Sequence, residues 1–154
     1  MSGKLAAELK QSKPFRLLEE EALLNLVRTH EHVQQRQAEF FRGFQITPTQ
    51  YNVLRILRGA GKDGLTCSQV AERMLTSDPD ITRLLDRLEA RRWIARERSP
   101  QDRRVVVTRI TAEGLDLLST IDKPLEAMLK RQAGHVSREH LRLFIEILES
   151  IREV

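Results

Sequence analysis

The chain has 154 residues, 40% of them hydrophobic and 31% charged, and this ordinary mixture predicts a single folded domain rather than a disordered chain. Lys and Arg number 26 against 22 Asp and Glu, so the net charge of +4 is too small to indicate a nucleic-acid partner by itself. One cysteine, Cys67, excludes an intramolecular disulfide and predicts a reducing compartment. No apolar stretch approaches the roughly 20 residues of a membrane span, and the first residues lack the apolar core of a signal peptide. We therefore expect a cytoplasmic protein without membrane contact.

Helix signals follow one another along the chain. Apolar side chains recur at helical spacing over residues 14–44, which predicts a long first helix. Thr47 and Thr66 each precede a glutamine by three residues, a capping-box pattern that predicts two shorter helices beginning there. Ser77, Asp78 and Asp80 supply cap groups for a further helix over roughly residues 78–91.

The helix over residues 78–91 is predicted to be amphipathic. Its apolar stripe consists of Ile81, Leu84, Leu85 and Leu88. The opposite face carries Pro79, Arg83, Asp86 and Ala90, with Thr82 and Arg87 on its flanks. Residues 76–90 sum to a charge of −2, so this segment alone is not expected to bind DNA strongly. Two interpretations of Asp78 and Asp80 stay open: they cap the helix, or one accepts a hydrogen bond from a cytosine amine.

A basic hairpin is predicted next. Residues 93–98 and 104–110 favour strands, joined by Ser-Pro-Gln-Asp. Seven arginines and two acidic residues lie between Arg91 and Arg109, a local charge of +5 that leaves the rest of the chain close to neutral. Such a concentration is typical of a phosphate-binding surface, although a solvated charged face is the alternative. Pro100 is expected to stiffen the turn, and Asp102 to hold a neighbouring arginine in position.

The last third of the chain predicts two more helices. Thr111 begins one of them, Pro124 is expected to bend it or divide it in two, and Gly134 ends it. Ser137 begins the final helix. The apolar stripes at the two ends of the chain exceed what one small lobe covers, which indicates an interface with another chain.

Two short helices followed by a hairpin are typical of a winged helix-turn-helix. An α-helix fits the major groove of B-DNA, and arginines on a hairpin reach the electronegative minor groove beside it. Ser68 and Gln69 are expected to contact the sugar-phosphate backbone. The predicted DNA-binding residues are Ser68, Gln69, Ser77, Asp78, Pro79, Thr82, Arg83, Arg87, Arg98, Asp102, Arg103 and Arg104.

Three motifs carry a family resemblance: the stretch Thr82–Glu89, the pair Asp102 and Arg104, and the helix start Ile110-Thr111-Ala-Glu-Gly114. Together they resemble the MarR family of bacterial transcription regulators. The resemblance implies a mainly α-helical protein with a small β-wing. It would form a single domain over residues 1–154, with a DNA-binding lobe at about 47–110 and dimerisation helices at about 14–44 and 111–154. The family often has glycine where Arg92 stands. Because a left-handed arginine costs roughly 1 kcal/mol, we expect that corner to differ.

The resemblance also implies a function. It is that of a homodimeric, DNA-binding transcription regulator, a repressor on a pseudo-palindromic double-stranded operator whose half-sites lie about 34–36 Å apart. A small aromatic or phenolic effector, or another signal, would release it. The sequence predicts no enzyme, no cofactor and no metal site, since no phosphate-binding glycine loop or ligand cluster is visible. The alternative is a winged-helix module that binds protein and has no specific affinity for DNA.

Two side chains keep alternative interpretations. Cys67 is either a small, inert, partly buried residue or a redox-sensitive thiol at a helix start. His30 either lies at the dimer seam or, with Arg16 or His32, lines a pocket for an aromatic acid, as the resemblance implies.

Overall fold

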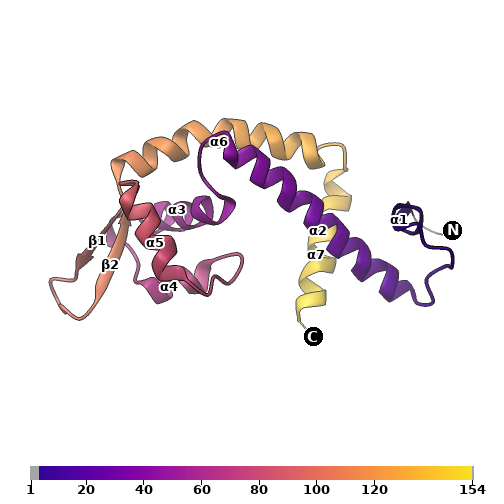
Figure 1. Cartoon of the computed structure of the whole chain (residues 1–154), viewed down its shortest axis with the longest axis horizontal. Coiled ribbons are helices and arrows are strands. Elements are labelled where there is room, and N and C mark those ends of the chain that lie inside the picture. Colours follow the sequence, from indigo (N-terminus) through magenta and orange to yellow (C-terminus); the bar gives the residue numbers. More distant parts are fainter. Residues whose placement is uncertain (1–3, 154) are drawn as a thin grey trace. The chain divides into compact units, whose positions relative to one another are not determined.

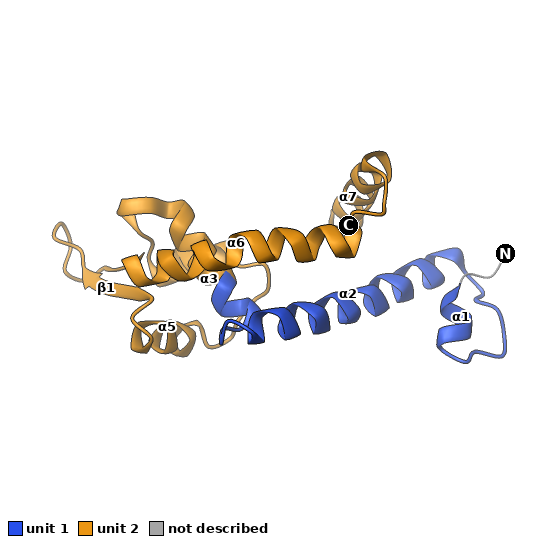
Figure 2. Ribbon diagram, turned by 90° about the horizontal axis from the view of Figure 1, so that it is seen from above, with its two compact units in different colours: residues 1–51 blue, residues 52–154 orange. Residues whose placement is uncertain are grey.

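The computed structural model describes residues 4–153, which form helices and one two-stranded sheet (Figure 1). The chain divides into two compact units, Met1–Tyr51 and Asn52–Val154, and the division falls inside one helix (Figure 2). Residues 1–3 and 154 of the predicted domain lie outside the described residues. The elements in chain order are α1 (Lys4–Glu8), α2 (Leu18–Arg42), α3 (Pro48–Ala60), the 3-10 turn η1 (Gly61–Asp63), α4 (Cys67–Arg73), α5 (Ile81–Ala90), β1 (Ile94–Arg98), β2 (Val106–Ile110), α6 (Ala112–Ala133) and α7 (Arg138–Arg152).

Unit 1 contains α1, α2 and the first turn of α3. The predicted first helix is confirmed but spans Leu18–Arg42, and the short helix α1 before it was not predicted. Aromatic side chains pack at the end of α2, where the Phe41 and Tyr51 ring centroids lie 4.6 Å apart. The predicted capping box at Thr47 is present, since its Oγ1 accepts from the Gln50 N–H at 3.1 Å and its own N–H donates to Gln50 Oε1 at 3.0 Å.

Unit 2 is built around a core of aliphatic side chains from α3 to α6. The Thr66 capping box opens α4 as predicted. Leu65 pairs with Thr108 in an isolated β-bridge, which joins the segment before α4 to the hairpin. The fully buried large side chains of this unit are Val53, Leu54, Leu57, Val70, Leu85, Leu88, Ile94, Thr108, Leu118 and Ile121.

Helix α5 begins later than predicted. Its N-cap is Asp80, whose Oδ1 accepts from the Arg83 N–H at 3.3 Å, so the expectation that Ser77 caps the helix is wrong. Asp78 Oδ1 accepts from the Asp80 N–H at 2.8 Å and closes a turn over Pro79. A proline disfavours helical backbone at the residue before it, so Asp78 cannot belong to the helix. The helix therefore starts only after this turn.

The end of α5 is a Schellman motif. The Arg92 N–H donates to the Glu89 carbonyl at 2.8 Å, and the Trp93 N–H donates to the Leu88 carbonyl at 3.1 Å. Arg92 has φ of 59°, so it occupies the left-handed position that usually takes glycine. The expectation that this corner differs is wrong. Arg92 adopts the left-handed backbone because both hydrogen bonds and the buried Trp93 after it require that path.

The hairpin is antiparallel, with Ile94 opposite Ile110 and Arg98 opposite Val106. Its second strand begins at Val106 rather than at residue 104, because Arg103 and Arg104 lie in the turn. Asp102 shapes this turn: its Oδ1 accepts from the Arg104 N–H at 2.9 Å, and its carbonyl accepts from the Val105 N–H at 3.0 Å. Asp102 thus positions Arg104, as expected, but through the backbone rather than through the guanidinium.

Helix α6 leads away from the hairpin and α7 follows it (Figure 1). The predicted caps at Thr111 and Ser137 are confirmed, and Gly134 ends α6. The Thr111-x-x-Gly114 start is explained by close packing, because a Cβ at Gly114 would collide with the Trp93 carbonyl oxygen. Helix α6 is one continuous helix through Pro124, so the proline does not divide it. Among the described residues, no helix is both long and apolar enough to cross a bilayer.

Candidate nucleic-acid interface

Helices α4 and α5 form a helix-turn-helix, and α5 presents a polar face to solvent. Leu84, Leu85 and Leu88 are buried, whereas Thr82 and Arg87 are exposed. Arg83 is also exposed, and its Nε lies 3.2 Å from Asp80 Oδ2. Asp80 therefore caps α5 with one oxygen and orients the Arg83 guanidinium with the other. This observation favours the capping interpretation of Asp80.

Arg96 on β1 binds two carboxylates of α5 at once. Its Nη2 lies 2.6 Å from Asp86 Oδ1 and 2.6 Å from Glu89 Oε2. Its Nε and backbone N–H also donate to the Glu89 carboxylate, at 3.0 and 3.2 Å. The hydrogen bond from Arg96 holds the pKa of Glu89 below its ordinary value, and the bond to Glu89 raises the pKa of Arg96. Sequence reasoning counted Arg96 only as part of the basic segment and missed this cluster.

The tip of the hairpin carries exposed arginines. Arg98, Arg103 and Arg104 are exposed, and Arg98 Nη1 donates to the Arg103 carbonyl at 3.5 Å. Within residues 4–153, no carboxylate pairs with the guanidinium of Arg103 or Arg104, and the same holds for Arg87 on α5. These side chains can therefore meet an external anion without breaking an internal ion pair.

Three arginines of the basic segment have internal roles instead. Arg96 binds α5, as described above. Arg109 Nε donates to the Lys62 carbonyl at 2.7 Å, and the Arg91 guanidinium lies 4.0 Å from the centroid of the Trp93 ring. The local charge counted from the sequence therefore overstates what the hairpin offers to a ligand.

Two residues that are predicted to contact the sugar-phosphate backbone lie at the start of α4. Ser68 and Gln69 are exposed, but the Gln69 side-chain oxygen already accepts from the Thr66 N–H at 2.9 Å. Ser68 Oγ lies 3.1 Å from Thr66 Oγ1. Cys67, the first residue of this helix, is half-buried. Ahead of α5, Ser77 and Pro79 are exposed and Asp78 is half-buried.

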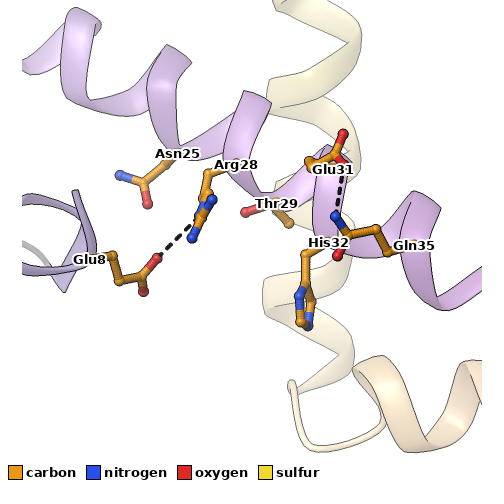
Figure 3. A pocket seen from close by; sticks show the side chains of 7 residues that line it. All are labelled: Glu8, Asn25, Arg28, Thr29, Glu31, His32 and Gln35. Atoms are coloured by element: carbon orange, nitrogen blue, oxygen red, sulfur yellow. Dashed lines mark hydrogen bonds and ion pairs between the residues drawn. The ribbon is translucent and has the colours of Figure 1, made fainter.

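A separate pocket of about 350 Å³ lies in unit 1 (Figure 3). It contains His32, but neither His30 nor Arg16, both of which are exposed elsewhere. Arg28 points toward Glu8 across it, with Nε 3.7 Å from Glu8 Oε2. In the part of the chain that the structure describes, no three His, Cys, Asp or Glu side chains gather as metal ligands. The pocket lining is Glu8, Asn25, Arg28, Thr29, Glu31, His32 and Gln35.

A helix-turn-helix whose second helix exposes a polar face, followed by a basic hairpin, defines the class of winged-helix DNA-binding proteins. The model of the MarR family matches residues 44–105. The transcriptional repressor MdtR of Bacillus subtilis (strain 168) is 30% identical over 118 residues, which cover 77% of this chain and 75% of MdtR.

Solved structures agree with this class. A MarR transcription factor from Planctomyces limnophilus is 38% identical and superposes with a TM-score of 0.69, covering 88% of this chain and 98% of the other. The S. aureus MepR–DNA complex is 25% identical with a TM-score of 0.74, covering 84% of this chain and 95% of MepR. The chain belongs to the MarR family, and it is a DNA-binding transcriptional regulator with the predicted winged-helix fold.

Proposed function

We propose that the protein is a homodimeric repressor that binds a pseudo-palindromic operator and is released by a small-molecule signal. DNA binding is proposed because α5 exposes a polar face and β1 lies beside it. Arg96 Nη2 on β1 lies 2.6 Å from Asp86 Oδ1 on α5. The wing thus begins next to the helix that would enter the major groove. MdtR is a transcriptional repressor, and MepR has been solved in complex with DNA. Both similarities support a DNA-binding repressor.

Each part of the interface has its own role in this proposal. Thr82, Arg83 and Arg87 contact base edges or phosphates in the major groove, and Arg103 and Arg104 enter the adjacent minor groove. Asp102 holds Arg104 in its turn. Ser68 and Gln69 contact the sugar-phosphate backbone. The other predicted DNA-binding residues on this surface are Ser77, Asp78, Pro79 and Arg98, and Asp78 shapes the turn before α5 by accepting from the Asp80 N–H at 2.8 Å.

A dimer is proposed because the helices at the two ends of the chain expose apolar side chains. On α2, Val27 is 65% exposed, and on α7, Ile145 is 53% exposed. A helix that exposes several large apolar side chains usually packs against another chain. A two-fold dimer places its two recognition helices on half-sites about 34–36 Å apart.

In this proposal, a small aromatic or phenolic effector releases the protein from its operator. The pocket of unit 1 offers Arg28 and His32 to a carboxylate, although Glu8 already pairs with Arg28 at 3.7 Å. A ligand can release DNA only if its affinity differs between the two states of the dimer. A panel of benzoates and phenols would be added to the operator complex. A Kd that rises with one of them supports this effector class, and a Kd unchanged by all of them contradicts it.

DNA binding is tested by fluorescence anisotropy on DNA from upstream of the gene, with a random duplex as competitor. The wild type is compared with Arg104→Ala over a range of salt concentrations, and Arg138→Ala on α7 removes one charge outside the wing. We expect Arg104→Ala to weaken binding and to flatten the salt dependence by about one phosphate contact. Arg138→Ala should bind as the wild type does. Equal affinity of all three proteins would show that the wing does not contact DNA.

The protein-interaction module is the competing function. It predicts weak binding to every duplex, with no effect of wing substitutions. The absence of any preferred fragment in a library of genomic DNA would favour it.

A further inference from the structure

The segment of residues 76–90, which contains the proposed recognition helix α5, carries negative charge on the surface that would face DNA. Residues 76–90 carry a charge of −2, and Asp86 lies in the middle of the exposed face of α5 with its side chain 55% exposed. A helix in the major groove lies between two rows of phosphates. Unmasked carboxylates at this place would repel the DNA and oppose docking.

Arg96 pairs with two of the carboxylates on α5. Its guanidinium lies 2.6 Å from a carboxylate oxygen of Asp86 and 2.6 Å from one of Glu89, so a single cation serves both acidic groups. Its side chain is only 23% exposed, so the guanidinium lies against α5 between the two carboxylates rather than in open solvent. The bond from its backbone N–H to Glu89 Oε1, at 3.2 Å, also ties the start of β1 to α5.

We propose that Arg96 is a positioning residue for DNA binding, which masks Asp86 and Glu89 and thereby allows α5 to lie among the phosphates. The proposal rests on the proposed function, because it concerns the same DNA-binding surface. Arg96 does not contact DNA in this account. It acts through the two carboxylates, and by fixing β1 on α5 it also sets where the wing starts relative to the recognition helix.

The masking role differs from a purely structural role in what restores binding. If the negative charges are what opposes docking, then neutralising them makes Arg96 dispensable. If Arg96 only holds β1 in place, then neutralising Asp86 and Glu89 removes its partners and restores nothing. A double-mutant cycle between Arg96 and the two carboxylates separates these roles.

The experiment measures operator affinity for four proteins, and for one further conservative variant, at several salt concentrations. They are the wild type, Arg96→Met, Asp86→Asn/Glu89→Gln, and the triple variant that combines all three changes. Methionine keeps a long apolar stem at position 96 while it removes the charge. Arg96→Lys is added as the conservative variant, and circular dichroism with thermal unfolding checks that each protein folds.

We expect Arg96→Met to weaken operator binding by at least about tenfold at low salt, since two carboxylates are left unmasked. The deficit should shrink as salt rises, because the repulsion is screened. The triple variant should regain most of the lost affinity, and Arg96→Lys part of it. Should Arg96→Met fail to fold, the triple variant decides alone, because it leaves no unpaired charge at positions 86, 89 and 96. Near wild-type affinity supports the masking role, and weak affinity overturns it.

The result that overturns the proposal is wild-type affinity in Arg96→Met, or a loss that the triple variant does not repair. Failure of the proposed function looks different. In that case the wild type itself has no preference for the operator over random DNA, and Arg104→Ala changes nothing.

Discussion

At the start of α5, Asp80 connects a structural role with a functional one. Its Oδ1 accepts from the Arg83 N–H at 3.3 Å, and its Oδ2 lies 3.2 Å from Arg83 Nε. An arginine with one edge held by a carboxylate keeps its planar fork oriented, and the other edge can donate two hydrogen bonds to guanine O6 and N7. We therefore expect Arg83, of the two arginines of α5, to be the one that reads a base.

This geometry predicts the effect of replacing Arg83 by lysine. Arg83→Lys keeps the charge and loses the fork, so we expect a loss of about 1–3 kcal/mol on the operator and little change on random DNA. Arg87→Lys serves as the matched control, because Arg87 has no carboxylate partner among residues 4–153 and is expected to contact phosphate. Parallel losses on operator and random DNA would show that Arg83 contributes only its charge.

Among the secondary-structure elements, α5 has at its end one residue with a strained backbone conformation. Arg92 has φ of 59°, a conformation that costs an arginine about 1 kcal/mol and costs glycine almost nothing. We expect Arg92→Gly to raise the free energy of unfolding by about 0.5–1 kcal/mol, measured by chemical denaturation. Ala90→Gly, at the last residue of α5, should instead lower it, by less than about 1 kcal/mol. A loss of stability in Arg92→Gly would contradict the Schellman geometry.

The contact between β1 and α5 predicts a pH dependence of stability. Arg96 lowers the pKa of Glu89 in the folded protein, so this pair stabilises the fold at neutral pH. The contribution is lost as the pH falls below the ordinary glutamate value of about 4.3 and through the lowered folded value. We therefore expect the Tm of Glu89→Gln to lie below that of the wild type at neutral pH and to approach it in acid.

Glu126→Gln is the control for this pH dependence. The hydrogen bond from Lys130 lowers the pKa of Glu126 as well, but that side chain is exposed on α6. Its effect on the Tm should disappear in high salt, whereas the effect of Glu89→Gln should persist. A Tm difference for Glu89→Gln that is independent of pH would contradict the account of this ion pair.

The elements differ in how far the sequence predicts them. Local signals were sufficient where a cap and its partner lie within one turn, as at Thr47, Thr66, Thr111 and Ser137. They were ambiguous at α5, where three residues can cap and the turn over Pro79 decides for Asp80. The Arg96 cluster was not predicted, because it joins residues seven and ten positions apart on two different elements.

At the scale of the whole molecule, the apolar faces of α2 and α7 predict a dimer. We expect Val27→Glu and Ile145→Glu to shift the protein toward monomers in sedimentation velocity, because each places a charge in the proposed interface. Leu75→Glu is the control, since Leu75 is 80% exposed but lies between α4 and α5. It should leave the oligomeric state unchanged. A wild type that sediments as a monomer would contradict the dimer.

Two copies of this winged helix are proposed to read a two-fold DNA site. Selection of bound fragments from a library of the organism's genomic DNA, followed by sequencing, tests this proposal. We expect enrichment of fragments that share a pseudo-palindrome with half-site centres one helical turn apart, about 10–10.5 base pairs. We also expect this enrichment to be lost in Arg83→Ala and Arg104→Ala. A library in which no common sequence is enriched by the wild-type protein would contradict the proposal.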